Sequence, residues 1–204
     1  IKPEIGLTFA RAIRHTLRQD PDVIMVGEIR DLEVLEVCVQ CSLTGNLVLT
    51  TLHASTSPGC IRRMLDMGLK PYLVASTLSA AISLRLVRKL CPKCRQPVQP
   101  KPHLLPPEAA EFLASRNDAQ FFAPKGCPHC GGGHGYLGRT AIHEILVMND
   151  RMRQLTTETS DIGTLRAAAV QEGMTTMLID GLEKAAQGIT SVEEVMRVVP
   201  LGAG

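Results

Sequence analysis

Two short apolar runs that flank one helical segment constrain the fold of this chain more than any other feature. Residues 23–26 and 47–51 have the length and the aliphatic character of β-strands. Asp31 can cap a helix that continues to about Leu43, so the order along the chain is strand, helix, strand. Such a unit pairs its two strands in parallel through a right-handed crossover. We therefore expect an α/β fold with a parallel sheet, in which the first strand is buried on both faces.

Further helices are predicted on both sides of this unit. Apolar residues recur at steps of four from Phe9 to Leu17, which indicates an amphipathic helix over residues 7–17 with Thr8 as its N-cap. Residues 75–90 favour a helix that becomes basic towards its end, where cations complement the helix dipole. We expect no membrane span, because the longest uncharged apolar stretch, residues 71–84, is shorter than the ~18 residues that a span requires.

The second half of the chain begins with a proline-rich segment. Six of the 13 prolines lie between residues 95 and 126, which predicts a linker with one short helix over residues 108–115. A helical pattern starts at residue 149. Asp161 and Ser191 are candidate N-caps, and Gly188 is a candidate helix stop. Ser191 is predicted to form a capping box with Glu194.

Composition narrows the classes of partner. The formal net charge of +2 gives no field that would favour nucleic acid or a membrane surface. Aromatic residues make up 3% of the chain and Trp is absent, so the stacking platforms of single-strand binders are missing. We therefore expect no nucleic-acid partner. The first residue is Ile1 rather than Met and no secretory signal precedes the first strand, so we expect a truncated chain whose translational start lies elsewhere.

Glu28 and His53 follow the two predicted strands. The carboxyl ends of parallel strands lie at one edge of a sheet, where open α/β folds hold nucleotide phosphates and Mg²⁺. A carboxylate at Glu28 could order a Mg²⁺-bound water or accept a proton from it, and His53 could contact a γ-phosphate. Each residue taken alone has a plainer interpretation, as a solvated acid after a core strand and as a structural histidine.

Two Cys-x-x-Cys pairs flank the proline-rich segment. Their ligand number and spacing favour a closed structural Zn²⁺ site over disulfide bonds, which fit badly with a chain that carries no signal peptide. A third pair, Cys38 and Cys41, lies within a predicted helix and is interpreted as core packing. The expected zinc ligands are Cys91, Cys94, Cys127 and Cys130.

Several segments together resemble one protein family. DPDVIMVGEIRD and LTGNLVLTTLHAS, followed by RRMLDMG, are similar to the Walker B and His boxes of the ATPases that drive type II secretion and type IV pilus assembly. RLVRKLCPKC, GCPHC and GYLGRTAIHEIL resemble the zinc-bearing subdomain of that family. The resemblance covers nearly the whole chain.

The resemblance implies a fold and a division of the chain. Residues 1–90 would be the C-terminal half of a RecA-like P-loop NTPase core, residues 91–140 a zinc-binding tetracysteine insertion, and residues 141–204 a C-terminal helical subdomain. It also implies a homo-hexamer that works with ATP and Mg²⁺ at the cytoplasmic face of the inner membrane, together with inner-membrane secretion or pilus platform proteins.

The same resemblance implies roles for single residues. Glu28 would be the catalytic glutamate and His53 the histidine of the His box, while Arg30 and Asp22 would support the nucleotide site. The phosphate-binding string G-x-x-x-x-G-K-[ST] does not occur in the sequence, so we expect the chain by itself to bind and hydrolyse ATP poorly. Two interpretations remain: a segment of a secretion motor, or a non-catalytic, zinc-stapled remnant or adaptor that binds the secretion platform.

Overall fold

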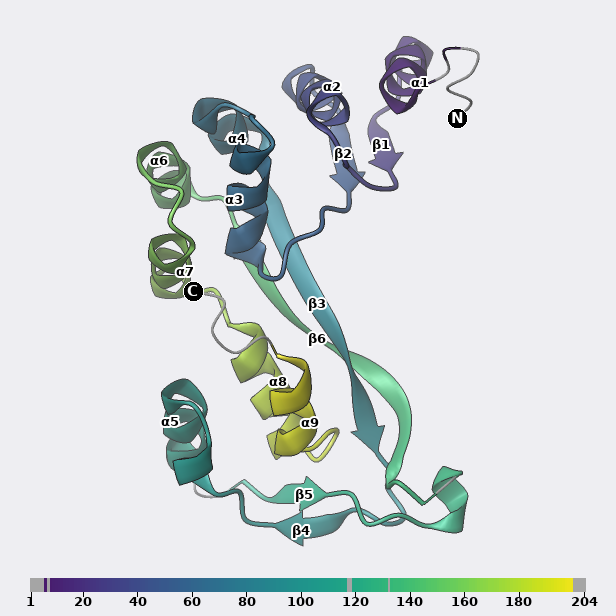
Figure 1. The fold of residues 1–204 in the computed structure, drawn as a ribbon, viewed down its shortest axis with the longest axis vertical. Coiled ribbons are helices and arrows are strands. Elements are labelled where there is room, and N and C mark those ends of the chain that lie inside the picture. The colour runs from purple at the N-terminus through teal and green to yellow at the C-terminus, as the bar shows by residue number, and fades with distance from the viewer. Residues whose placement is uncertain (1–5, 7, 117–118, 132, 200–204) are drawn as a thin grey trace. The chain divides into compact units, whose positions relative to one another are not determined.

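The computed structural model describes residues 6, 8–116, 119–131 and 133–199 (Figure 1). These residues form two compact units. The first contains the described residues up to 81 together with residues 146–172, and the second contains those within 82–145 and 173–199. Each unit is described by itself below.

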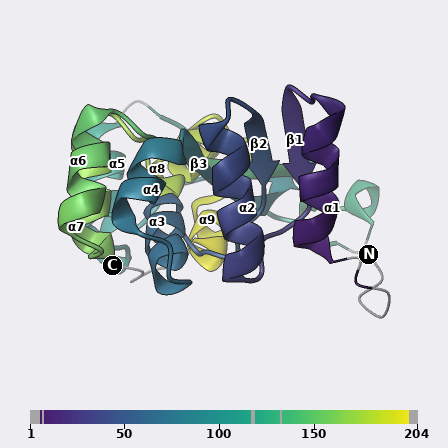
Figure 2. The same cartoon turned by 90° about the horizontal axis from the view of Figure 1, so that it is seen from above.

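The first unit is built on a small parallel sheet. Strands β1 (Val23–Val26) and β2 (Leu47–Thr50) pair in parallel, with Val23 opposite Leu47 and Val26 opposite Thr50. Helices α1 (Phe9–Thr16) and α2 (Leu32–Leu43) lie next to each other along this sheet (Figure 2). The remaining helices of the unit are α3 (Ser57–Asp66), α4 (Pro71–Thr77), α6 (Asp150–Glu158) and α7 (Ile162–Gln171).

Local signals at the start of the chain are confirmed. The Thr8 hydroxyl accepts a hydrogen bond from the backbone N–H of Arg11 at 3.3 Å, and the Asp31 carboxylate accepts one from Val34 at 2.9 Å. The predicted strand–helix–strand unit is present with parallel strands. Residue 7, the expected start of the first helix, lies outside the described residues.

The expectation that the first strand is buried on both faces is wrong for the described part of the chain. Ile24 and Val26 are 5% and 4% exposed, but Val23 and Met25, which point to the opposite face, are 53% and 77% exposed. Side chains alternate across a strand, so the described residues cover one face of the sheet and leave the other open. The apolar run predicted the strand correctly, but it did not reveal that the described residues cover only one face of this strand.

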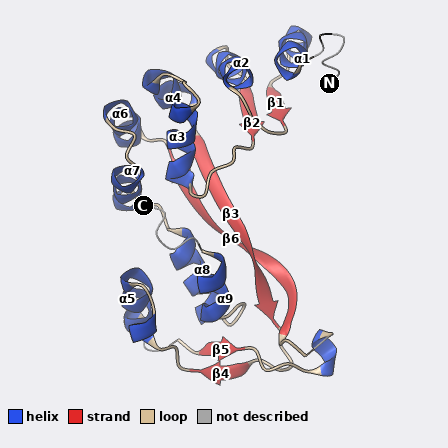
Figure 3. Cartoon of the chain, viewed as in Figure 1, coloured by secondary structure: helices blue, strands red, loops and turns tan. Residues whose placement is uncertain are grey.

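The helix expected over residues 75–90 is also wrong. Helix α4 ends at Thr77, and residues Ala80–Leu90 form strand β3, which pairs with β6 (Tyr136–Val147) (Figure 3). The segment is rich in Ala, Leu, Arg and Lys, which favour helices in isolation. Pairing with a strand about fifty residues later overrides that preference, and buried Ala81, Ser83 and Val87 follow the period of two that a strand requires.

The second unit packs the proline-rich segment into a core. Strands β4 (Gln96–Val98) and β5 (Phe121–Ala123) pair antiparallel, and the predicted short helix is present as α5 (Pro107–Ser115). The segment is not a simple linker, because its apolar side chains join those of α8 (Met177–Ala186) and α9 (Val192–Val198) in one cluster. The cluster consists of Ala109, Phe112, Leu113, Phe121, Leu178, Leu182, Ala185 and Val195.

The C-terminal helices begin and end largely as predicted. Asp161 and Ser191 are N-caps, and Gly188 follows α8 with a φ of +70°, the left-handed conformation that glycine favours. Ser191 accepts a hydrogen bond from the backbone N–H of Glu194. The Glu194 carboxylate, however, accepts from the backbone N–H of Arg88 and from the side chains of Arg88 and Arg197, and not from Ser191 as a capping box requires. Short 3₁₀ helices occur at Leu17–Gln19, Pro102–Leu104 and Pro128–Cys130.

The structure does not support a single C-terminal helical subdomain. Helices α6 and α7 belong to the first unit, whereas α8 and α9 belong to the second, and residues 141–147 are part of β6. Within the described part of the chain, no helix has the length and apolarity needed to cross a membrane.

Candidate functional site

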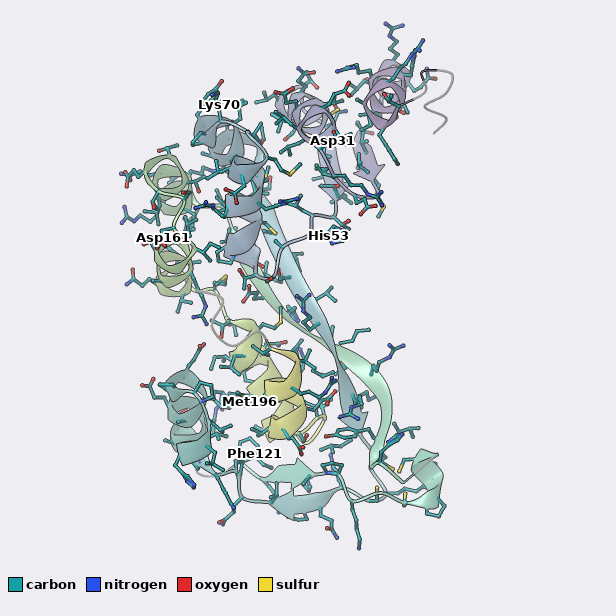
Figure 4. All side chains as sticks on the ribbon, in the orientation of Figure 1. Asp31, His53, Lys70, Phe121, Asp161 and Met196 are labelled. Atoms are coloured by element: carbon teal, nitrogen blue, oxygen red, sulfur yellow. The ribbon has the colours of Figure 1, made fainter. Side chains whose placement is uncertain are left out.

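Glu28 and His53 lie together at the carboxyl edge of the β1–β2 sheet. The Oε2 atom of Glu28 is 3.2 Å from Nε2 of His53. Glu28 follows β1 and His53 follows β2, and parallel pairing brings the two loops to the same edge, as the strand order predicts. Figure 4 labels His53 on the loop that leaves β2.

Arg30 completes this cluster from the same loop as Glu28. Its Nε atom donates a hydrogen bond to Oε1 of Glu28 at 2.6 Å, and a terminal guanidinium nitrogen contacts the same oxygen. The hydrogen bond from Arg30, followed by its charge and by the contact with His53, lowers the pKa of Glu28 against the opposing effect of burial. Glu28 is therefore ionised at neutral pH and acts as a hydrogen-bond acceptor.

The cluster is open to solvent. The side chains of His53 and Arg30 are 87% and 77% exposed, whereas that of Glu28 is 30% exposed. A carboxylate has about four acceptor positions, so contacts with Arg30 and His53 leave room for a water molecule or another donor. The Glu28 carboxylate can therefore orient a water molecule by hydrogen bonding, and Arg30 and His53 can donate hydrogen bonds to an anion.

Asp22 is not part of this cluster. It precedes the first residue of β1, at the end of the strand opposite to Glu28, and its backbone carbonyl accepts a hydrogen bond from Leu47 at 2.9 Å. Its side chain is exposed. The supporting role expected for Asp22 stays a prediction that the geometry of this edge does not favour.

Sequence reasoning missed Thr51, which contacts the loop that carries Glu28. The Thr51 hydroxyl donates a hydrogen bond to the backbone carbonyl of Gly27 at 2.7 Å. The backbone carbonyl of Thr51 accepts one from the N–H of Ile29 at 3.0 Å. The only signal in the sequence was a hydroxyl side chain two residues before His53, which is too common to single out.

The four predicted zinc ligands form a second cluster, in the second unit. Their sulfur atoms all lie within 4.8 Å of one another, and Sγ of Cys127 is 3.9 Å from those of Cys91 and Cys130. These separations exclude disulfide bonds and agree with the edge of about 3.8 Å that Zn–S bonds of about 2.3 Å give in a tetrahedron. Cys91, Cys94 and Cys130 are buried. The four thiols can therefore hold a metal ion.

Backbone hydrogen bonding and burial shift the pKa values of the thiols in this cluster in opposite directions. The N–H of Cys127 donates to Sγ of Cys130 at 3.3 Å, and this bond is the main cause that lowers the Cys130 pKa to about 7. Burial raises the pKa of Cys94 to about 11, which disfavours its thiolate without a cation nearby. A side chain at Gly126, whose φ is +100°, would overlap the carbonyl oxygen of Gly133, so the turn before Cys127 requires glycine.

The third Cys-x-x-Cys pair is part of the core, as expected. Cys38 and Cys41 are 5% and 0% exposed on α2. Burial raises the pKa of the Cys38 thiol to about 11, which keeps it protonated at neutral pH.

Comparison with known proteins identifies the family. The family model described as type II/IV secretion system protein matches residues 1–197. The chain belongs to this family. Among its relatives is the type II secretion system ATPase E of Vibrio cholerae, 45% identical over 97% of this chain and 38% of the relative. The type IV pilus assembly ATPase PilB of Thermus thermophilus is 43% identical over 96% of this chain and 22% of its own length.

Two solved structures have a fold similar to that of this chain. The pilus retraction motor PilT with bound ADP matches with a TM-score of 0.63 and 27% identity over 94% of this chain and 43% of that chain. The ATPase DotB of Legionella pneumophila matches with a TM-score of 0.64 at 22% identity over 94% of this chain and 42% of that chain, which shows similarity of fold alone. The chain thus spans between 22% and 43% of the length of these four proteins.

Proposed function

We propose that this chain is part of an ATP-hydrolysing motor in a bacterial type II secretion or type IV pilus assembly machine. The observation that carries the proposal is the contact between Glu28 and His53 at the carboxyl edge of two parallel strands. It occurs in a chain whose relatives are named as ATPases of both machines. In this proposal, residues 1–90 are the C-terminal half of a RecA-like core, and ATP hydrolysis drives extension of a pilus or pseudopilus.

The proposed chemistry assigns one task to each residue of the cluster. Glu28 orients the water that attacks the γ-phosphate, and its lowered pKa favours this orienting role over that of a strong base. His53, which is highly exposed, contacts the phosphate, and Arg30 keeps Glu28 ionised. Bound ATP and Mg²⁺ supply the transferable phosphoryl group and neutralise its charge.

The proposal extends to the metal and to the assembly. The cluster of four thiols holds Zn²⁺ as a closed structural site within residues 91–140. Family membership supports a homo-hexamer that acts at the cytoplasmic face of the inner membrane with platform proteins. Relatives from the two machines are 45% and 43% identical to this chain, so the proposed motor is of the type II secretion or type IV pilus assembly class.

The test is the substitution Glu28→Gln in the complete ATPase that carries these residues. Gln keeps the size of the side chain but removes the negative charge and replaces one acceptor oxygen by an NH₂ donor. It can therefore not orient the attacking water as Glu28 does, and the turnover number should fall by at least about 100-fold while ATP binding changes little. Glu36→Gln is a matched control, because Glu36 is an exposed glutamate of α2 outside the cluster. Normal turnover in the Glu28 variant would remove Glu28 from catalysis, and a complete protein without ATPase activity would favour the non-catalytic adaptor.

A further inference from the structure

Thr51 contacts the backbone on both sides of Glu28. Its hydroxyl donates to the carbonyl of Gly27 at 2.7 Å, and its carbonyl accepts from the N–H of Ile29 at 3.0 Å. Both bonds lie beyond the last strand pair, Val26 with Thr50. They therefore extend the contact between the two strands into the loops that carry the functional side chains.

These two bonds fix both residues that flank Glu28, because Gly27 and Ile29 are each hydrogen-bonded to Thr51. Ile29 is 5% exposed and anchors the chain in the core immediately after Glu28. Gly27 has no side chain that could hold its position, so its carbonyl depends on the Thr51 hydroxyl for this contact with the neighbouring strand. The backbone carbonyl of Thr51 would remain after any substitution, whereas the bond to Gly27 requires the side chain.

Thr51 also lies two residues before His53, on the loop that follows β2. Thr51 therefore connects the Glu28 loop to the segment that carries His53, whose Nε2 lies 3.2 Å from the Glu28 carboxylate. Catalytic groups must keep their relative positions closely, because a displacement of about 1 Å can reduce a rate by about 100-fold.

We infer that Thr51 is a positioning residue for Glu28, which holds the carboxylate at the distance from His53 that catalysis needs. This inference rests on the proposed hydrolysis of ATP at Glu28. It goes beyond that proposal by naming the group that aligns the two loops. Thr51→Val removes the hydroxyl and preserves both the shape of the side chain and its preference for a strand.

The first experiment measures amide hydrogen exchange in the 204-residue chain without nucleotide. Loss of the bond to Gly27 should let the end of the sheet open more often, and the Ile29 amide should exchange about 5-fold faster in Thr51→Val. Thr51→Ser keeps a hydroxyl and should restore most of the protection. In Thr16→Val, which loses a comparable 3.1 Å bond from a hydroxyl to a helix carbonyl on α1, the Ile29 amide should exchange as in the unchanged chain.

The second experiment measures ATP turnover in the complete ATPase. Thr51→Val should lower kcat about 10-fold or more with KM for ATP within about 2-fold, and Thr51→Ser should recover most of kcat. If Thr51→Val keeps the wild-type kcat while Glu28→Gln is inactive, the positioning role of Thr51 is overturned but the proposed function is not. Unchanged Ile29 exchange in Thr51→Val would also overturn it, because the hydroxyl would then not hold the loop. Normal turnover in Glu28→Gln would instead overturn the proposed function on which the inference rests.

Discussion

Glu194 provides the sharpest test of the physical account of the second unit. Its side chain is fully buried at the start of α9, where Nη2 of Arg88 donates to Oε2 at 2.7 Å and two nitrogens of Arg197 donate at 2.8 Å each. The Arg88 guanidinium also lies 4.1 Å from the centre of the Tyr136 ring. Replacing Glu194 by Gln removes the negative charge from this cluster and keeps the volume of the side chain.

The expected magnitude follows from the pKa of Glu194. Burial alone would raise this pKa, but hydrogen bonds from Arg197 and Arg88 outweigh burial and lower it from 4.5 to about 2. At about 1.4 kcal/mol for each pH unit, the ionised carboxylate contributes about 3 kcal/mol to the free energy of unfolding. Because the pKa is lowered in the folded state, this contribution is complete above pH 4.5 and is lost as the pH falls towards 2.

Tyrosine fluorescence can follow the second unit selectively. The chain has no Trp and 2 Tyr, so in a Tyr72→Phe background the signal comes from Tyr136. Urea unfolding at pH 7 should show that Glu194→Gln costs about 3 kcal/mol. Glu193→Gln is the matched control, since Glu193 is exposed in the same helical turn and changes the charge near the helix N-terminus equally.

The comparison of the two variants between pH 7 and pH 2 decides the outcome. The difference in unfolding free energy between Glu194→Gln and Glu193→Gln should shrink as the pH falls below 4.5. Loss of metal from the thiols at low pH affects both variants alike and cancels in this difference. Equal stability of the two variants at pH 7, or a difference that does not change with pH, would refute the reasoning.

Two further predictions concern the metal cluster and the contact between α8 and α9. Replacing Cys91 and Cys127 together by Ser should release zinc, measured as metal content after dialysis, because two of four ligands are lost; a double variant with unchanged zinc content would rule out the site. Gly181→Ala should lower the unfolding free energy by about 1–3 kcal/mol, because the added Cβ would lie 2.6 Å from Cγ1 of buried Val195. This cost should exceed the gain from the higher helix propensity of Ala. A stabilised variant would show that the contact has room for the methyl group.

Features that depend on a few neighbouring residues could be predicted from the sequence. The caps at Thr8, Asp31 and Ser191 each bond to a backbone N–H three residues later, so the signal and its partner lie in one short segment. Glu28 and His53 could be placed together because each follows a strand, and the carboxyl ends of two parallel strands lie at the same edge of a sheet. The cysteine spacing likewise predicted the cluster of four thiols without knowledge of the fold between the pairs.

Other features depended on partners far away along the chain. Residues 80–90 have a composition that suits a helix, and pairing with β6 made them a strand. The proline-rich segment resembled a linker until α8 and α9 supplied the apolar surface on which Phe112 and Phe121 pack. No sequence pattern pairs Arg88 with Glu194, and only the fold brings β3 and α9 together.

The sequence by itself thus determined the strand–helix–strand unit, several helix N-caps, the residues that meet in the two clusters and membership of the family, because each rests on short-range patterns or on residue identity. Only the tertiary structure decided that Thr51 tethers the Glu28 loop, that β3 is a strand, and that Glu194 is buried between two arginines. The physical reason is that these contacts gain their free energy from partners that are distant in sequence, which local propensity cannot register.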